Sequence, residues 1–314
     1  MPVTVLAIDI GGTKLAAGVV DRDGRILARG EVPTLAAEGP ARVLERIVGL
    51  GQALLGRSEV SRGAVHRIGV GCAGPVDRLA GLVLNPPNLP GWTRVALADH
   101  LQQAFGLPAV LENDANAAAL GEFRYGAGKG ARSLVYLTVS TGIGGGIILD
   151  GKIWHGLNDA AGEIGHMTLI PDGPLCGCGN HGCLEAIASG PSIARRAREA
   201  LAAGRPTRLR GMPGLTSADV VRLAQEGDKV AGEVWGETVR YLGLGVSAAI
   251  TILAPERVVI GGGVTEAGEF LFEPLRCEVR SRVKLVPMES IPILPAALGR
   301  DVGILGSAAV ALDA

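Results

Sequence analysis

Apolar residues in the first thirty positions fall into three runs that turn residues separate. Val3 to Ile8 and Leu15 to Val20 flank the sequence Gly11-Gly12-Thr13, and Asp21 to Gly24 leads into the third run. Short apolar runs bounded by Gly, Asp and Thr are typical of strands joined by tight turns. The pattern therefore predicts a three-stranded meander.

A helical spacing follows the meander. Between Pro40 and Gly56, apolar side chains recur three and four positions apart, which predicts an amphipathic helix. The apolar segment from Ile68 to Cys72 then predicts a buried strand. A block of strands followed by helices and further strands indicates an α/β fold.

The opening pattern recurs near the middle of the chain. An apolar run from Leu134 to Val139 precedes Ser140-Thr141-Gly142, and Gly144 to Gly146 leads into Ile147 to Leu149. Chance is one explanation in a chain with 48 Gly. The other is a pair of equivalent hairpins in two lobes that face each other across a cleft, which is a natural place for a nucleotide.

Two later segments complete the outline. Ala203 to Thr216 is rich in Arg, Gly and Pro and is expected to be a surface loop, with a helix starting near Ser217 and carrying Asp219 in its first turn. Val258 to Gly263 predicts another strand that ends in glycines.

Length and composition limit the class of protein. A chain of 314 residues exceeds the range in which one hydrophobic core keeps growing, so two lobes are expected. With 47% hydrophobic and 19% charged residues, the chain is globular and not disordered. The net charge of −1, with Lys and Arg scattered, favours neither nucleic acid nor an anionic membrane as a partner.

Targeting signals are not evident in the sequence. The first residues lack a basic segment and include Asp9, unlike a secretory signal. The longest apolar stretch, Leu242 to Ala254, is too short to span a bilayer. We expect a cytoplasmic enzyme that acts on small ligands.

The loop Asp9 to Lys14 is a candidate phosphate-binding turn. Gly11 and Gly12 leave their backbone N–H groups open to a phosphate, and Thr13 and Lys14 add donors. The Walker spacing is absent. An ordinary hairpin turn is the alternative, and the second loop, Ser140 to Gly146, favours the phosphate interpretation.

Asp114 lies near the predicted first turn of a helix that begins after Glu112-Asn113. A plain N-cap is the simple interpretation of such an Asp. The positive end of the helix dipole also keeps a carboxylate ionised, which suits a base that accepts a hydroxyl proton during phosphoryl transfer. Both roles are compatible.

Four residues predict a metal site: His166, Cys176, Cys178 and Cys183. Three thiolates and one imidazole form a closed tetrahedral zinc set without an open position, so the zinc would be structural. Unrelated buried cysteines are the alternative.

Glu163 and Glu185 flank the predicted metal site, which would hold both carboxylates in place. Carboxylates, amides and imidazoles are groups that bind sugar hydroxyls. Asn88, on a proline-rich loop, could add an amide to that set, although a turn residue is the better explanation of Asn88 taken alone.

Together these residues resemble bacterial glucokinases of the ROK (repressor, open reading frame, kinase) family along nearly the whole chain. The resemblance rests on Asp9 to Lys14, Gly74-Pro75-Val76-Asp77, Asn88 to Trp92, Glu112 to Ala118, Ser140 to Gly146, Glu163 to His166, Cys176 to Glu185 and Gly261 to Gly263.

The resemblance implies a two-lobed actin-like or hexokinase-like fold, a duplicated ribonuclease H-like unit with a central cleft for ATP and magnesium. On this basis we expect a small domain at 1–115, to which 300–314 returns, and a large domain at 116–299 that carries the zinc loop. A homo-oligomer, dimer or tetramer, is also expected.

The resemblance also assigns roles to residues. Asp114 corresponds to the base that deprotonates the 6-hydroxyl of the hexose. The expected sugar-binding residues are Gly74, Asn88, Asn113, Asp114, Glu163, His166 and Glu185. The expected nucleotide-site residues are Asp9, facing magnesium, Gly11, Gly12, Thr13, Lys14, Thr141 and Gly142 on the phosphates, and Gly262 and Gly263 at the adenosine.

Two alternatives remain at this point. One is a kinase for another hexose, such as fructose, mannose, N-acetylmannosamine or N-acetylglucosamine, because these relatives share the same loops. The other is a sugar-sensing repressor, whose helix-turn-helix domain would precede the sugar domain. Because Asp9 already belongs to the phosphate loop, we expect no such domain and no nucleic-acid partner.

Overall fold

The computed structural model describes residues 3–57, 60 and 62–314, which form two compact units. Unit 1 consists of Met1–Arg132, Gly146–Gly162 and Ala297–Ala314, and unit 2 consists of Ser133–Gly145 and Glu163–Ala296.

A five-stranded sheet forms the centre of unit 1, with the strand order β3-β2-β1-β4-β8. Its strands are β1 (Thr4–Ile10), β2 (Lys14–Asp21), β3 (Ile26–Pro33), β4 (Val65–Cys72) and β8 (Ala109–Asn113). Strands β1, β2 and β3 are antiparallel neighbours, whereas β4 and β8 run parallel to β1. The predicted meander and the predicted strand from Ile68 to Cys72 are confirmed.

A smaller antiparallel sheet contains β5 (Val76–Asp77), β6 (Leu82–Val83) and β7 (Val95–Ala96).

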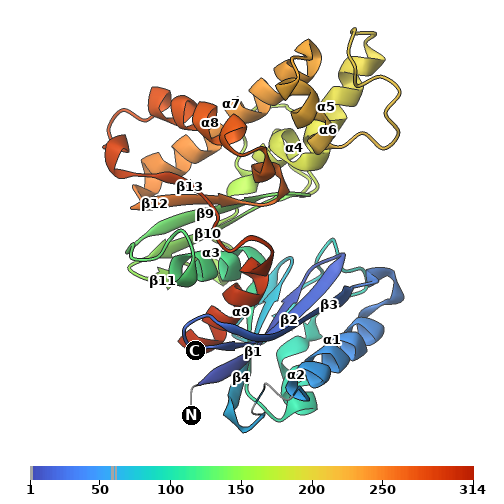
Figure 1. The fold of residues 1–314 in the computed structure, drawn as a ribbon, viewed down its shortest axis with the longest axis vertical. Coiled ribbons are helices and arrows are strands. Elements are labelled where there is room, and N and C mark those ends of the chain that lie inside the picture. Colours follow the sequence, from blue (N-terminus) through green and yellow to red (C-terminus); the bar gives the residue numbers. More distant parts are fainter. Residues whose placement is uncertain (1–2, 58–59, 61) are drawn as a thin grey trace. The chain divides into compact units, whose positions relative to one another are not determined.

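Helices cover both faces of the sheet in unit 1 (Figure 1). Alternate residues of β1 point to opposite faces, so Leu6 and Ile8 join the core beneath α1 (Pro40–Leu55) and α2 (Leu97–Phe105). Val5 and Ala7 pack on the other face against α9 (Val302–Asp313). The predicted helix between Pro40 and Gly56 is confirmed as α1.

Helix α9 lies unusually close to its neighbour α3 (Asp114–Tyr125). A Cβ atom at Gly306 would lie 2.3 Å from the carbonyl oxygen of Ala117, so the two backbones touch there. This packing places α3 in unit 1. The first boundary, expected after residue 115, therefore falls at Arg132, and the returning segment, expected from 300, begins at Ala297.

The second sheet has the order β11-β10-β9-β12-β13. Its strands are β9 (Leu134–Val139), β10 (Ile143–Leu149), β11 (Lys152–Ile153), β12 (Arg257–Gly261) and β13 (Ile293–Pro295), and the division between the units runs through β10. Strands β12 and β13 lie on one side of β9 and run parallel to it, just as β4 and β8 lie on one side of β1 and run parallel to it. The two sheets thus have equivalent strand orders, as expected for a duplicated fold.

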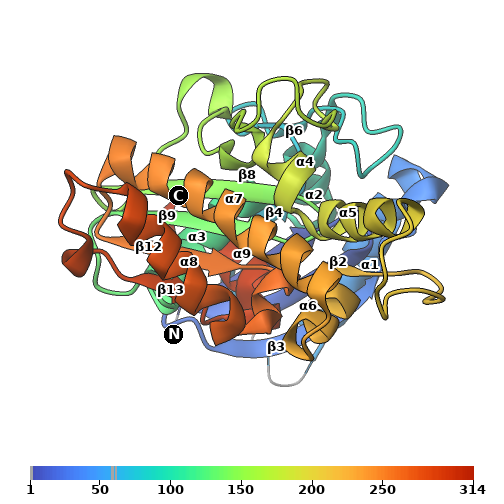
Figure 2. The ribbon, with the colours of Figure 1, turned by 90° about the horizontal axis from the view of Figure 1, so that it is seen from above.

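Five helices accompany the sheet in unit 2: α4 (Leu184–Ala188), α5 (Gly190–Ala202), α6 (Ser217–Gln225), α7 (Lys229–Leu253) and α8 (Glu269–Arg282). In the view of Figure 2, α7 and α8 lie in front of β9 and β12, and the buried side chains of all four elements belong to one core. The predicted helix near Ser217 is confirmed as α6, where Thr216 and Asp219 form a capping box.

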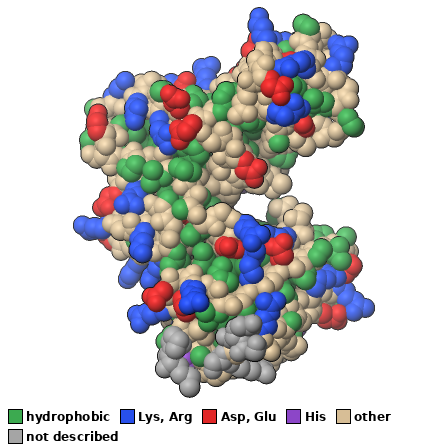
Figure 3. Space-filling view, in the orientation of Figure 1, with side chains coloured by type: hydrophobic (Ala, Val, Ile, Leu, Met, Phe, Trp, Pro, Cys, Tyr) green, Lys and Arg blue, Asp and Glu red, His purple; other side chains and the backbone are tan. Residues whose placement is uncertain are grey.

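Charges of both signs are interspersed on the face shown in Figure 3, without a continuous basic area. Within the described part of the chain, no helix is both long and apolar enough to cross a membrane.

The contact between α3 and α9 leads to a stability prediction. Gly306→Ala should lower the free energy of unfolding by about 1–3 kcal/mol, because its new methyl group meets backbone atoms that cannot move away. Gly49→Ala in α1 is the matched control, since nothing lies within 4 Å of the added methyl group. It should raise stability by about 0.5–1 kcal/mol. Urea unfolding would compare the two, and equal effects would contradict the prediction.

Candidate active site

The predicted phosphate loop of unit 1 is the turn between β1 and β2. Gly11 N–H donates to the carbonyl oxygen of Lys14 at 2.9 Å, which closes the turn. The buried Thr34 fixes it from the side, because its hydroxyl donates to the Gly11 carbonyl at 2.6 Å and its N–H donates to the Thr13 carbonyl at 2.9 Å. Thr13 and Lys14 are exposed. The loop thus has a defined backbone with accessible donors.

Gly12 brings this loop against the proline-rich segment. A Cβ atom at Gly12 would lie 2.8 Å from Cβ and 2.9 Å from the carbonyl oxygen of Asn88, so only glycine fits without a shift. Asn88, a predicted sugar ligand, therefore lies directly beside the predicted phosphate loop.

Asp9 lies at the same edge of the sheet, one residue before the end of β1. Its carboxylate lies at the beginning of α9, where a Cβ atom on Gly303 would be 2.2 Å from Oδ2. Burial, and to a smaller extent the charge of the Asp114 carboxylate, raise the pKa of Asp9 to about 7, although Lys14 acts to lower it. A divalent cation bound between Asp9 and Asp114 would reduce the repulsion between the two carboxylates, so this pair is a candidate cation site.

Asp114 is the first residue of α3, and the residue before it supplies the N-cap. Asn113 Oδ1 accepts from the N–H groups of Ala115 at 2.9 Å and Asn116 at 3.2 Å, while its Nδ2 donates to the Gly74 carbonyl at 3.2 Å. The simple interpretation of Asp114 as the N-cap is therefore wrong. The side-chain amide of Asn113 is instead engaged within the protein, and Asp114 keeps its place at the positive end of the helix.

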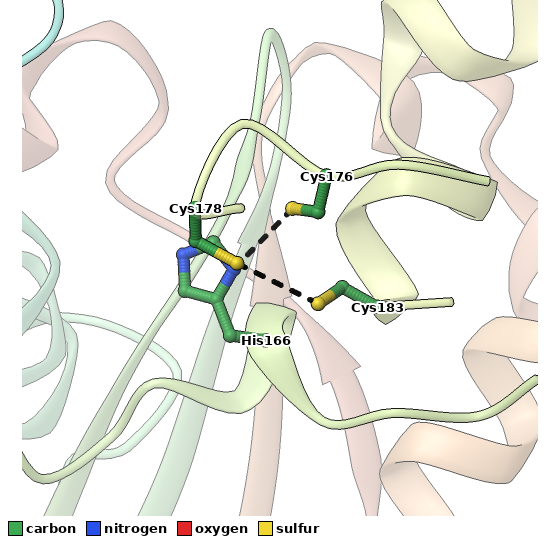
Figure 4. Close-up of side chains that lie close together, drawn as sticks. All are labelled: His166, Cys176, Cys178 and Cys183. Carbon is green, nitrogen blue, oxygen red and sulfur yellow. Dashed lines mark hydrogen bonds between the residues drawn. The ribbon is translucent and has the colours of Figure 1, made fainter. Parts of the chain in front are cut away.

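The four predicted metal ligands lie together in unit 2 (Figure 4). The ligand atoms of His166, Cys176, Cys178 and Cys183 are all within 4.8 Å of one another. Cys176 Sγ is 3.6 Å from His166 Nδ1, and the Sγ atoms of Cys178 and Cys183 are 3.7 Å apart. Metal–sulfur bonds of about 2.3 Å in a tetrahedron separate sulfur atoms by about 3.8 Å. The cluster therefore matches a zinc site in residue type and spacing.

The thiols of this cluster differ in acidity. Burial raises the pKa of Cys176 to about 12, whereas a backbone hydrogen bond from Asn180 lowers the pKa of Cys178. Burial also raises the pKa of Cys183. A cation with high thiolate affinity is what would deprotonate such a set at neutral pH.

Glu185 connects the cysteine cluster with the second glycine loop. Its Oε2 accepts from the Ile143 N–H at 2.8 Å, directly after Thr141 and Gly142, and its Oε1 lies 3.6 Å from Cys176 Sγ. The loop is closed by Ser140 N–H, which donates to the Gly142 carbonyl at 2.8 Å. The sequence indicates Glu185 only as a sugar-binding residue and does not predict this contact with the second loop.

Glu163 and His166 lie at the two ends of one short turn, because the 3₁₀ helix Ile164–His166 follows Glu163 directly. His166 Nε2 is 3.7 Å from Glu163 Oε2, on the ring side opposite the sulfur atoms. One ring nitrogen thus faces the cysteines and the other faces a carboxylate. Gly262 and Gly263 lie beside the second loop, because the parallel register pairs Gly261 with Thr138.

The structure therefore groups the predicted residues within each unit. Unit 1 brings together Asp9, Gly11, Gly12, Thr13, Lys14, Gly74, Asn88, Asn113 and Asp114. Unit 2 brings together Thr141, Gly142, Glu163, His166, Cys176, Cys178, Cys183, Glu185, Gly262 and Gly263. Sequence reasoning missed Glu112, which is buried behind Asn113, and its partner His155.

The ROK family model matches residues 5–314. This chain belongs to the ROK family. A glucokinase of Thermotoga maritima is 38% identical over 98% of this chain and 96% of its own length. An N-acetylmannosamine kinase of Salmonella arizonae is 36% identical over 98% of each chain.

A solved structure of another family member is similar throughout. The ROK family glucokinase of Streptomyces griseus, in complex with glucose and AMPPNP, has a TM-score of 0.82 and 36% identity and covers 99% of this chain and 100% of its own. The expected fold of two α/β units with duplicated sheets is thus that of the family.

The raised pKa of Asp9 leads to a prediction for Asp9→Asn without added divalent cations. Folded Asp9 binds a proton up to about pH 7, whereas in the unfolded chain it does so only up to about 3.8, so wild-type stability should fall as pH rises between these values. The Asp9→Asn variant has no carboxyl group to ionise at this position, so its stability should not fall in this way as pH rises. At pH 8 it should be more stable than the wild type, by up to about 4 kcal/mol, and at pH 4 the two should be alike. Urea unfolding at both pH values measures the difference; a constant difference would contradict the assignment.

Proposed function

We propose that this protein transfers the γ-phosphoryl group of ATP to the 6-hydroxyl of glucose, with Asp114 as the base. The observation that carries the proposal is the position of Asp114 at the start of α3, where its charge acts on Asp9 beside the phosphate loop. A base and phosphate donors on one sheet edge are what phosphoryl transfer to a hydroxyl requires.

The reaction depends on a base that stays ionised until the hydroxyl proton leaves. The first turn of α3 favours the charged form of Asp114, because the helix N-terminus is positive. The hexose hydroxyl would donate its proton to this carboxylate as its oxygen bonds to the γ-phosphorus of ATP, and the bond between that phosphorus and the oxygen of the departing ADP would break. Asn113 holds the turn in place through the cap and through the Gly74 carbonyl.

We assign the nucleotide to the two glycine loops. Backbone N–H groups of Gly11 and Gly12, with the side chains of Thr13 and Lys14, would bind phosphate oxygens from unit 1. Thr141 and Gly142 would do so from unit 2, with Gly262 and Gly263 at the adenosine. Magnesium near Asp9 would neutralise phosphate charge when bound.

We assign the sugar to Asn88, Asn113, Asp114 and the Gly74 turn in unit 1, and to Glu163, His166 and Glu185 in unit 2. A structural zinc on His166, Cys176, Cys178 and Cys183 would keep the unit 2 groups in position. His166 supports this arrangement, because its two ring nitrogens face the sulfur cluster and Glu163 respectively.

A second candidate is phosphorylation of another hexose, above all N-acetylmannosamine. The similarity to the Salmonella arizonae kinase favours it. The base, the phosphate loops and the metal ligands would act alike in both reactions, so the choice depends on groups around the sugar ring.

A homo-oligomer, dimer or tetramer, is also part of the proposal. Light scattering after size-exclusion chromatography tests it directly, and a mass near 32.1 kDa would contradict it.

Asp114→Asn tests the base. The variant should bind glucose within about tenfold of the wild type and lose about 10²–10⁴-fold in kcat, because it cannot accept the proton. Asp99→Asn, which changes an exposed carboxylate in the first turn of α2, should keep full activity. A coupled ATP assay over a panel of hexoses measures both variants. Full activity of Asp114→Asn would exclude it as the base, and preference for N-acetylmannosamine would support the second candidate.

Cys178→Ser tests the metal centre. Loss of one ligand should remove bound zinc, measured by plasma mass spectrometry, and weaken glucose binding, measured by calorimetry. Cys277→Ser, an exposed cysteine outside the cluster, should change neither quantity. Zinc loss with unchanged glucose affinity would mean that the metal does not organise the sugar site.

A further inference from the structure

Glu112 is a buried carboxylate directly before the Asn113–Asp114 turn. Its side chain is only 2% exposed. Oε1 accepts from the Asn113 N–H at 3.0 Å and from Asn116 Nδ2 at 3.1 Å. Oε2 lies 2.7 Å from His155 Nε2. Both oxygens thus have partners, and one partner is the peptide that precedes the proposed base.

His155 belongs to the segment Gly146–Gly162, which returns to unit 1 after a passage through unit 2. Four residues later, Asp159 Oδ2 accepts from the Arg78 N–H at 3.0 Å, and Arg78 Nε is 3.5 Å from Oδ1. Arg78 directly follows β5, and Gly74 lies two residues before the same strand. Since Asn113 Nδ2 donates to the Gly74 carbonyl, the polar contacts form a closed ring through three segments of unit 1.

A closed ring restrains the turn more strongly than any single bond. A buried carboxylate is costly unless its oxygens are hydrogen-bonded, so Glu112 favours only the arrangement in which its donors meet it. That arrangement fixes the Asn113 peptide and the first turn of α3. A displacement of about 1 Å in a catalytic group can lower the rate by about 100-fold.

We propose that Glu112 and His155 are positioning residues, which hold Asp114 in line with the acceptor hydroxyl without touching either substrate. The inference rests on the proposed phosphoryl transfer. It predicts that breaking the Glu112–His155 contact impairs the chemical step more than nucleotide binding.

The space around Glu112 and His155 leaves room for other side chains at position 155. Glu112 and His155 line a cavity of about 620 Å³ within unit 1, whose other walls include the apolar side chains of Leu111, Leu120 and Ile153. A leucine at position 155 therefore meets open space and apolar neighbours, and no overpacking is expected.

The test compares His155→Leu, which lacks a donor to Glu112, with His155→Gln, whose amide N–H takes the place of Nε2. For His155→Leu we expect a 10–100-fold lower kcat with a KM for ATP within about threefold of the wild type. His155→Gln should recover kcat to within about threefold. Asp150→Asn is the matched control, since Asp150 lies in the same segment and lines the same cavity, while its ion pair with Arg132 is exposed. It should keep full activity.

Loss of stability alone would give a different result. Thermal unfolding would shift, but kcat per folded molecule would be the same in His155→Leu and the wild type, and that outcome overturns the proposal. An equal loss in His155→Leu and His155→Gln also overturns it, because the restored donor should restore the position.

A readout without catalysis separates this proposal from the proposed function. Amide hydrogen exchange of Asn113, Ala115 and Asn116 should be faster in His155→Leu than in the wild type and Asp150→Asn. Unchanged exchange overturns the positioning role even if no hexose is phosphorylated. If wild-type protein phosphorylates no hexose while exchange still rises, the proposed function fails and the restraint on the turn stands.

Discussion

The close packing of α9 against β1, β4 and α3 is the constraint on which the candidate site of unit 1 depends. At Gly306 the helix meets the backbone of α3, and at Gly303 it meets the carboxylate of Asp9. Directly after Gly306, the buried Ser307 hydroxyl accepts from the Gly71 N–H at 2.9 Å and donates to the Ile8 carbonyl oxygen at 2.8 Å. The last helix of the chain thereby places the ends of two parallel strands and the start of α3, so that Asp9 and Asp114 come close enough to influence each other.

Buried or half-buried carboxylates that accept backbone N–H groups recur where distant segments meet. Glu122 in α3 accepts from Ala127 at 2.8 Å, Ala297 at 3.1 Å and Leu298 at 2.9 Å, where the chain re-enters unit 1. Glu112 holds the peptide before Asp114, and Glu185 holds the end of the second glycine loop. In each case a charged group costs free energy unless all its partners are in place, so the same contact stabilises the segment and specifies its position.

Local patterns were enough to predict much of the fold. The hairpin around Gly11-Gly12-Thr13, the amphipathic α1 and the capped α6 depend on residues close in sequence, where periodicity and turn chemistry are informative. The metal ligands were found for the same reason, because three cysteines within eight residues fold around one point. The N-cap was misjudged, since neighbouring Asn113 and Asp114 are equally suitable in sequence and only the hydrogen bonds to Ala115 and Asn116 distinguish them.

The sequence by itself determined the class of fold, the two glycine loops, the cysteine cluster and the candidate base. Only the tertiary structure decided that α3 packs with α9 in unit 1, that Glu112 pairs with His155, and that Glu185 binds the second loop. The physical reason is the separation along the chain. Packing of Gly306 on Ala117 and pairing of Glu112 with His155 join residues 189 and 43 positions apart, and no local pattern of hydrophobic and polar residues encodes such partners.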